Sequence, residues 1–445
     1  MEASTSFPRN VSARTIHSLA YRGMGIFDPA WQKKLTVRFT LKDYATFLGL
    51  DLRATRAIGT IFCLKEAIKE FQHSADLVPS SKHIPSLELK SINSPSERLW
   101  ICQVVDQHAP RLWQAMIDPK QDNVAMTHDT YLKLWQLTGP RIAGTDVIML
   151  DEAQDANPVM IEILRKQALR LILVGDTWQQ IYSFRGAINA MEKIDTPLVS
   201  YLTQSFRFGQ DVADLANAVL KLRSAPKFLR GHPRKLSSVG ELPPGQKCTV
   251  IFRTNIQLLE EAIDLASKRR RIHIVGSLEK TAGLVTDVYH LFAKEKARIK
   301  DPKLRIFKNW AELEANVDIL DDIELKKSFR FVGNYGYEIP KIMAMVKKSD
   351  APSPEASDVI LTTAHKSKGQ EWANVRISED FFDAIREGDR EELNLVYVAF
   401  TRAIVHLEVP TKILECLDLK EKASLEALRR EQNTRHPELV EGSHP

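Results

Sequence analysis

The sequence predicts an α/β fold in which parallel strands alternate with helices. Two short apolar runs, residues 146–150 and 169–174, have the length and composition of buried strands. A helical pattern over residues 160–166 separates them. Strand, helix and strand in this order form a parallel repeat. Each strand ends in an aspartate-containing turn, at the edge where open α/β sheets bind their ligands.

The first of these turns carries two adjacent carboxylates. Asp151 and Glu152 directly follow the first strand. One carboxylate that holds Mg²⁺ and a neighbour that positions water are the minimal equipment for hydrolysing a nucleotide. The same segment also has the residues of a helix start, because Asp155 or Asn157 can cap a helix that begins at Pro158. On this turn alone the two interpretations stand equally.

The second turn favours a ligand site. Beyond residue 174 the chain places Asp176, Gln179, Tyr182, Phe184 and Arg185 within a short segment. An amide can contact a phosphate, while aromatic rings and a cation are typical of proteins that bind single-stranded nucleic acid. Each aromatic residue taken singly belongs more often to a core than to a base-stacking platform. Together they indicate a site.

These two turns resemble those of a known family. Residues 151–155 and 174–187 are similar to motifs II and III of the UvrD/Rep-type superfamily 1 DNA helicases. Further segments resemble the other motifs in the family's order: residues 15–18 (motif Ib), 202–207 (motif IV), 361–372 (motif V) and 395–403 (motif VI). Residues 7–21 look closest to the F-box DNA helicase branch and its bacterial relatives. The resemblance implies two RecA-like P-loop NTPase motor domains with helical insertions.

The resemblance implies catalytic roles around ATP. Asp151 would hold Mg²⁺ through water, and Glu152 would activate the attacking water molecule. Gln179 would sense the γ-phosphate. Arg207 and Arg402 would act as arginine fingers, which accelerate hydrolysis by about 10³–10⁵ in other NTPases.

The resemblance also implies the remaining ligand contacts. Those to the nucleotide would come from Phe206, which would stack on adenine, and from Asp176, Gly369 and Glu371. Those to single-stranded DNA would come from His17, Tyr182, Phe184, Arg185, His365 and Lys368. Isolated histidines more often bond a backbone carbonyl, and outside such a motif Arg207 would more often form a surface ion pair. The basic run at residues 268–271 is interpreted as a solvated helix end rather than a DNA patch.

The sequence lacks one element of that family. The pair Gly-Lys never occurs, so there is no P-loop (Walker A) triplet Gly-Lys-Ser/Thr, whose backbone N–H groups and lysine hold the phosphates. Residues 1–14 are too few for a strand, P-loop and helix of roughly 30 residues. We therefore expect weakened binding of ATP and Mg²⁺, and a gap or open edges in the first motor sheet. Three explanations stay open: a mis-assigned start, a companion chain that carries the P-loop, or a truncated, decaying fragment.

Composition agrees with a folded DNA-binding protein. At 445 residues the chain has room for about three domains of roughly 150 residues, and an apolar fraction of 44% is enough for real cores. A net charge of +5 is compatible with DNA without indicating it specifically. Four scattered cysteines imply neither a zinc site nor disulfides. Because no signal peptide or membrane span is visible, we expect a cytoplasmic (nucleoid) or nuclear protein that is not secreted.

The motifs suggest a domain organisation. The expected parts are residues 1–28 and 116–200 (partial motor domain 1A), 29–115 (a helical 1B-like insertion), 201–285 and 356–413 (motor domain 2A), 286–355 (a small 2B-like insertion) and 414–445 (a charged tail).

Two functional hypotheses of different classes follow. The first is an ATP-dependent DNA helicase that moves 3′ to 5′ on single-stranded DNA, impaired or incomplete as this chain. The second is a non-catalytic DNA-binding remnant, or one half of a split helicase. A helicase–nuclease fusion is disfavoured because little sequence follows motif VI, and no F-box is visible.

Overall fold

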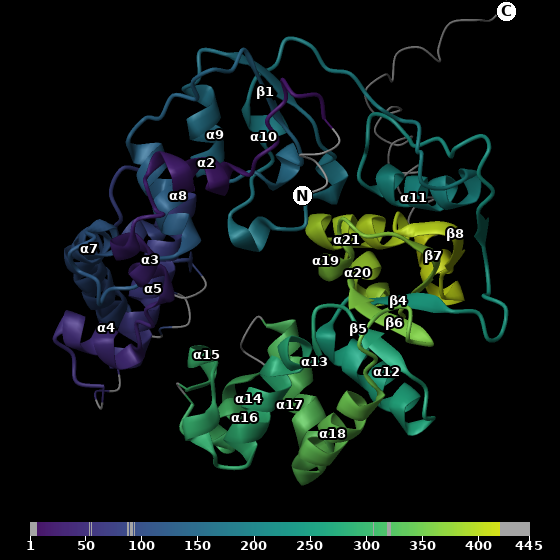
Figure 1. Cartoon of the computed structure of the whole chain (residues 1–445). Coiled ribbons are helices and arrows are strands. Elements are labelled where there is room, and N and C mark those ends of the chain that lie inside the picture. Colours follow the sequence, from purple (N-terminus) through teal and green to yellow (C-terminus); the bar gives the residue numbers. More distant parts are fainter. Residues whose placement is uncertain are drawn as a thin grey trace, which may run out of the picture. The chain divides into compact units, whose positions relative to one another are not determined.

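The structure is a computed structural model that describes residues 7–418 with short gaps. The gaps are Arg53, Thr55, residues 87–88, residues 90–91, Asn93, Ile306 and residues 318–321. Two compact units, Met1–Pro197 and Leu198–Pro445, divide the chain (Figure 1). From residue 419 onward, the expected charged tail lies outside the described residues.

A parallel strand pair forms the sheet of the first unit. Its members are β1 (Val147–Leu150) and β2 (Arg170–Leu173), and helix α9 (Pro158–Arg165) connects them. The predicted parallel repeat is therefore confirmed. Asn157 caps α9 by accepting a hydrogen bond from the Met160 N–H, and a proline occupies the first turn. The helix-start interpretation thus holds for Asn157, which is a different residue from the two carboxylates that follow β1.

Helices form most of the remainder of this unit. The longer ones are α2 (Ile16–Gly23), α3 (Pro29–Thr36), α4 (Leu41–Leu48), α5 (Ala57–His73), α7 (Pro95–Ile117) and α8 (His128–Leu137), with the short α10 (Ala190–Lys193) near its end. The 3-10 turns are η1 (Ser81–His83), η2 (Ala153–Asp155), η3 (Thr177–Gln179) and η4 (Ser183–Arg185). Helices α4, α5 and α7 share a core around Phe71, Leu112 and Trp113. A second core joins α2, α8 and α9 around Ala20 and Leu132.

One face of the β1–β2 sheet is covered and the other is open. Leu150 and Leu173 pack against residues of η2, α9 and α10. On the opposite face, Met149 is 63% exposed and Val147 and Ile172 are each 40% exposed. Among the described residues, no third strand pairs with either one. This is unusual, because parallel sheets are normally buried on both faces.

The second unit contains a larger parallel sheet. Its strands lie in the order β3-β8-β7-β4-β6-β5, all parallel. Their bounds are β3 (Ser238–Val239), β4 (Cys248–Phe252), β5 (Ile272–Ile274), β6 (Val359–Thr363), β7 (Trp372–Ile377) and β8 (Ala403–Glu408). The fold class predicted from the sequence, α/β with parallel strands, is therefore correct for both units.

Helices cover both faces of this sheet. They are α11 (Gln210–Leu222), α12 (Asn255–Ser267), α19 (Ala364–Ser367), α20 (Phe381–Glu387) and α21 (Arg390–Phe400). Helix α12 packs against the face that carries Val250 and Phe252, whereas α11 and α21 lie on the other side (Figure 1). The fully buried Ile251 and Leu361 at the centre show why these strands read as continuous apolar runs.

The helical segment expected as a 2B-like insertion shares the core of this unit. Helix α13 (Leu278–Thr281) precedes this segment, residues 286–355, and α14 (Gly283–Phe292) crosses its expected start. The elements within it are η5 (Lys296–Arg298), α15 (Pro302–Arg305), α16 (Trp310–Val317), α17 (Ile323–Tyr335), η6 (Gly336–Glu338) and α18 (Ile339–Ser349). Val288, Phe331 and Val346 belong to the same apolar cluster as Val250 of β4. The expected borders at residues 115/116 and 285/286 fall inside α7 and α14. The subdomain borders remain predictions.

Within the described residues, no helix is both long and apolar enough to cross a bilayer.

In the basic run after α12, two of the four cations pair with carboxylates: Lys268 contacts Asp264 at 2.6 Å and Arg270 contacts Asp358 at 3.6 Å. Such pairing agrees with the solvated helix end expected there.

We predict that the open face of the β1–β2 sheet promotes self-association. Replacing Met149 by Gln should lower the concentration-dependent association of the purified chain, because an exposed apolar sheet face is sticky in water. Thermal stability should change by less than about 0.5 kcal/mol, since Met149 is mostly exposed. Light scattering against concentration measures the effect. Leu77→Gln, at a 72% exposed position outside the sheet, is the matched control, and equal association of both variants would contradict the prediction.

Candidate functional site

The turn after β1 presents both predicted carboxylates at the surface. Asp151 and Glu152 are exposed, and Asp151 Oδ1 accepts a hydrogen bond from the Glu152 N–H at 3.0 Å. Glu152 has a left-handed backbone, with φ of 52°. This conformation costs a non-glycine residue on the order of 1 kcal/mol or more, and such residues cluster at functional sites. The Ala153 N–H bonds the Val174 carbonyl at 2.9 Å and fixes the turn to the neighbouring strand end.

A buried amide joins this turn to the one after β2. Gln154 is fully buried. Its Nε2 donates to Glu152 Oε2, and its Oε1 accepts from the Asp176 N–H at 3.0 Å. A Cβ added at Gly175 would lie 2.3 Å from Gln154 Oε1, so only glycine leaves room for this amide. The sequence analysis missed Gln154; the signal was an amide between acids, directly after a buried strand.

The second turn holds the predicted phosphate sensor. Asp176 Oδ2 accepts a hydrogen bond from Gln179 Nε2 at 2.9 Å, while Oδ1 accepts from the Trp178 N–H at 3.0 Å. Both Asp176 and Gln179 are half-buried. Together with the carboxylate pair after β1, they form one continuous polar group at the carboxyl ends of two parallel strands.

The predicted aromatic contacts for DNA follow directly. The rings of Tyr182 and Phe184 lie 6.1 Å apart in an edge arrangement, and Phe184 is 58% exposed. The side chain of Arg185 lies outside the described part of the structure. Gly186 has φ of +76°, and a Cβ there would meet His73 Cβ at 3.0 Å. Helix α5 therefore packs directly beneath this loop.

A histidine–aspartate–histidine cluster connects the same region to motif Ib. Asp129 contacts the Nε2 atoms of His17 at 3.0 Å and of His73 at 3.4 Å. Hydrogen bonds from His17 and then from His73 hold the pKa of the Asp129 carboxyl well below its usual range. The buried Lys133 amine donates to the Ser74 carbonyl at 2.7 Å and so fixes the end of α5 beside His73. Sequence reasoning found His17 but neither of the residues that orient it.

The second unit gathers several of the other predicted residues. Phe206 is 74% exposed, and its ring lies 5.9 Å from that of His232. Arg207 Nε donates to Glu371 Oε2 at 2.6 Å, and Arg207 Nη1 donates to the Thr401 carbonyl at 2.9 Å. Arg207, a predicted arginine finger, and Glu371, a predicted nucleotide contact, are thus ion-paired partners.

The other predicted residues of this unit surround the segment after β6. His365 lies in α19, and Lys368 follows directly, with both side chains half-buried. Gly369 has φ of +79°, which favours glycine although nothing crowds the position. Arg402 is 2% exposed, and it donates to the Val398 carbonyl at 2.8 Å and to the Gln370 carbonyl at 3.3 Å. Its guanidinium group therefore lies in the interior of the unit.

Within the described residues, no group of three or more His, Cys, Asp or Glu side chains is arranged to hold a metal ion. A Mg²⁺ site would therefore rest on Asp151 together with water and substrate oxygens, the arrangement that Mg²⁺ usually takes in nucleotide sites.

Comparison with known proteins agrees with this arrangement of motifs. Residues 8–196 match the UvrD/REP helicase N-terminal domain. F-box DNA helicase 1 of Gallus gallus is 31% identical over 441 residues, which cover 89% of this chain and 42% of that protein. F-box DNA helicase protein 1 of Schizosaccharomyces pombe is 31% identical over 93% of this chain and 52% of its own length. DNA helicase IV of Escherichia coli is 26% identical over 61% of this chain and 35% of its own length.

Residues 8–196 therefore carry a UvrD/REP helicase N-terminal domain. F-box DNA helicases are similar to this chain along most of its sequence, and the chain spans about half of their length.

We predict that Gly175→Ala disrupts the link between the two turns. The added methyl group would displace the Gln154 amide and should lower the free energy of unfolding by about 1–3 kcal/mol, the usual range for overpacking. Urea denaturation measures the change. The control is Gly59→Ala in α5, where nothing lies within 4 Å of the new Cβ; there we expect no loss, or a gain of up to about 1 kcal/mol. Equal losses in the two variants would contradict the prediction.

We also predict a pH-dependent contribution from Asp129. Its pKa is lowered in the folded chain, so its contribution to stability is complete above the unfolded pKa of about 3.9 and is lost as the pH falls through the folded pKa. Asp129→Asn should lower the free energy of unfolding by about 1 kcal/mol near neutral pH. The expected loss is small because the carboxylate is 38% exposed. The difference from wild type should shrink below about pH 4. The measurement is the urea midpoint of wild type and variant across pH. Asp383→Asn, at a 70% exposed carboxylate, is the control. A difference between wild type and Asp129→Asn that does not vary with pH would contradict the prediction.

Proposed function

We propose that this chain forms the DNA-gripping and nucleotide-responsive part of an ATP-dependent DNA helicase that moves 3′ to 5′ along single-stranded DNA. The observation that carries the proposal is the linked pair of turns in the first unit. The Gln154 amide couples the Glu152 carboxylate to the segment of Asp176 and Gln179. A conformational change at the nucleotide would thereby reach the loop that carries the two predicted aromatic DNA contacts, Tyr182 and Phe184.

Each unit supplies a different set of nucleotide contacts. We assign the two units to RecA-like motor domains 1A and 2A. In the first, Glu152 would orient and deprotonate the attacking water, and Gln179 would sense the γ-phosphate. In the second, Arg207 would neutralise charge that develops on the transferred phosphoryl group. The exposed ring of Phe206 is suited to stack on adenine, and Glu371 would contact the ribose side.

The exposed carboxylates after β1 fit a magnesium ion, since hard carboxylate oxygens are its preferred ligands. Asp151 would hold the ion through water. When bound, Mg²⁺ neutralises phosphate charge and orients the phosphates.

Single-stranded DNA would contact both units. In the first unit, we assign this role to His17, oriented by Asp129, and to Tyr182 and Phe184. In the second unit, we assign it to His365 and Lys368. The site of action would accordingly be the nucleoid or the nucleus.

The phosphate cradle is the part that these 445 residues do not supply, because Gly-Lys-Ser/Thr does not occur in them. We propose that a P-loop segment from outside this sequence completes the first unit, either in the same polypeptide or in a companion chain. The open apolar face around Met149 and Ile172 supports this proposal, because a further strand with its helix would bury that face.

A second candidate function is a non-catalytic DNA-binding remnant. The same missing triplet favours it, since phosphate binding in this family depends on the P-loop. The two candidates share the DNA contacts and differ in whether nucleotide hydrolysis occurs.

We predict that residues 1–445 bind single-stranded DNA but hydrolyse ATP very slowly. A form that also carries the P-loop segment should hydrolyse ATP when DNA is added, and Glu152→Gln should reduce that rate by about 10²–10⁴-fold, the usual contribution of a general base. Phosphate release and fluorescence anisotropy of labelled DNA are the measurements. The control is Glu338→Gln, at a 68% exposed carboxylate. Rapid, Glu152-dependent turnover by residues 1–445 alone would contradict the need for an external cradle, and absence of DNA binding would contradict the assigned function.

A further inference from the structure

A basic segment of the second unit contributes only the His232 ring to the site described so far, and its cations have no role there. Residues 221–235 comprise the last two residues of helix α11 and the loop after it, and they contain no aspartate or glutamate. Its six basic residues are Lys221, Arg223, Lys227, Arg230, Arg234 and Lys235. We propose that this segment, together with Tyr201 and Phe228, forms a second binding surface for single-stranded DNA. The proposal extends the proposed function and rests on DNA being the ligand of this chain.

The segment is held in a defined backbone conformation. The Arg230 N–H donates to the Thr203 carbonyl at 2.9 Å, and the Ser205 N–H donates to the Arg230 carbonyl at 2.8 Å. One residue further, a Cβ added at Gly231 would lie 2.2 Å from the backbone nitrogen of Gln210. The basic segment therefore packs closely against the start of α11, so its cations are presented from a fixed scaffold.

Four cations of this segment have no carboxylate partner among the described residues. Lys227, Arg230, Arg234 and Lys235 are exposed, and no ion pair with Asp or Glu involves any of these four within the described residues. Lys235 instead donates to the backbone carbonyl of Phe206 at 2.7 Å. A protein surface that concentrates positive charge without compensation attracts polyanions.

The basic run after α12 gives a useful contrast. There, Lys268 and Arg270 each have a carboxylate neighbour, Asp264 and Asp358 respectively. Two basic runs in one unit thus differ in charge compensation. The segment at 221–235 presents exposed cations without such ion pairs at Lys227, Arg230, Arg234 and Lys235, which is why we assign the DNA contact to it.

Aromatic rings lie among these cations. Tyr201 is 54% exposed and Phe228 is 44% exposed, and both line one hollow with Lys227 and Arg230. Exposed aromatic rings that alternate with cations suit single-stranded nucleic acid, because unpaired bases can stack on the rings while the phosphates contact the cations. Duplex DNA buries its base faces and would use the cations alone.

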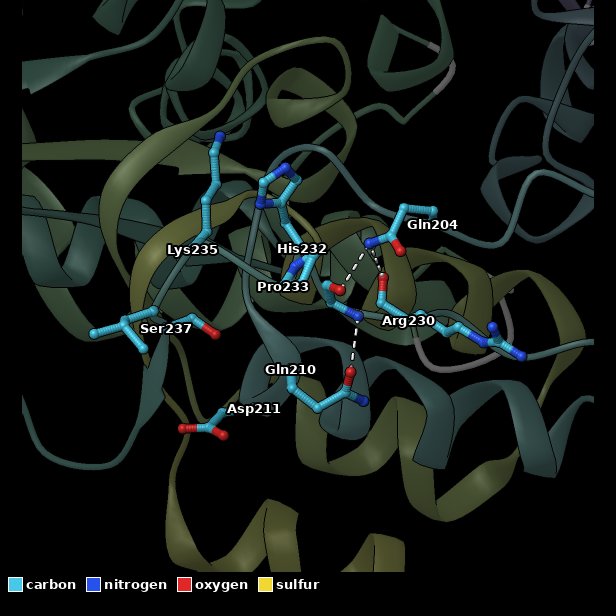
Figure 2. Close-up of a pocket in the computed structure, with 10 residues that line it drawn as sticks. Gln204, Gln210, Asp211, Arg230, His232, Pro233, Lys235 and Ser237 are labelled. Carbon is cyan, nitrogen blue, oxygen red and sulfur yellow. Dashed lines mark hydrogen bonds between the residues drawn. The ribbon is translucent and has the colours of Figure 1, made fainter.

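A second hollow adjoins the first through Arg230 and continues the surface toward Phe206. Figure 2 shows Lys235 and His232 extending to the same side of this loop, away from the Asp211 carboxylate. Asp211 is the acidic residue that lines this hollow. Because Arg230 and Lys235 are exposed, the basic side chains of this hollow can contact phosphates.

The first test removes charge from residues that have no assigned role in nucleotide binding. We expect Lys227→Gln/Arg234→Gln to weaken binding of labelled oligo(dT) and to reduce the slope of log affinity against log salt by about 1.4, or about 0.7 for each phosphate contact on a single strand. Lys268→Gln/Arg270→Gln is the matched control, and it should keep the wild-type affinity and slope. Thermal melting of each variant shows whether it is folded.

The second test addresses the rings. Tyr201→Ala/Phe228→Ala should reduce affinity for oligo(dT) by about tenfold or more and should leave binding of blunt duplex DNA unchanged. The control is Tyr337→Ala, which removes a 71% exposed ring elsewhere in the unit.

The outcomes distinguish a failure of the proposed function from a failure of this second DNA-binding surface. If the wild-type chain binds no DNA, the proposed function fails and this surface fails with it. If the wild-type chain binds and both surface variants bind equally well, the surface inference alone is wrong. If the charge variant loses duplex binding and retains single-strand binding, the surface is a duplex contact and the assignment to single-stranded DNA is overturned.

Discussion

The parallel arrangement of the strands is the constraint on which both units depend. Parallel strands place all their carboxyl ends at one edge of a sheet. Residues that follow different strands therefore lie close together even when they are far apart in sequence. In the first unit this brings the turn at Glu152 against the turn at Asp176, joined by Gln154. In the second unit, His365 follows β6, and Arg253 directly follows the adjacent strand β4. The candidate residues that directly follow β1, β2 and β6 owe their placement to this geometric rule.

The same constraint explains how the two sheets differ. A parallel sheet needs cover on both faces, because its strands are apolar on both sides. The six strands of the second unit satisfy this need with helices on each face. The two strands of the first unit satisfy it on one face only, which leaves Met149 63% exposed. An uncovered face next to the turn at Glu152 is what we would expect of a unit that a further segment completes, so the open face supports the proposal of an external phosphate cradle.

Much of the architecture could be predicted from the sequence, because it depends on local patterns. The strands of both sheets are short apolar runs, and the helix caps, such as Asn157, are local polar residues followed by proline. The cluster around Asp129 could not be predicted in this way. Asp129 and His17 are 112 residues apart, and no periodicity in either helix indicates that they meet. Gln154 lay within the motif, yet its burial follows from a contact with Gly175 that only the folded backbone provides.

The two predicted arginine fingers also differ in a way that the sequence cannot reveal. Arg207 is partly exposed and pairs with Glu371, whose side chain is 52% exposed. Exposed pairs of this kind contribute about 0–1 kcal/mol, so exchanging the carboxylate for a phosphate costs little. Arg402 is buried and donates to the Val398 and Gln370 carbonyls.

Moving Arg402 toward a ligand would break these hydrogen bonds of a buried, charged guanidinium group, at a cost of about 1.5–3 kcal/mol for each. The energies therefore favour Arg207 as the residue that reaches a phosphate. In the conformation described, Arg402 is better suited to hold the turn at Gln370, directly beside Glu371. A fully buried arginine in a motif can thus serve the site by positioning its neighbours, and the exposed arginine of the pair is the one whose present partner is weak enough to be replaced.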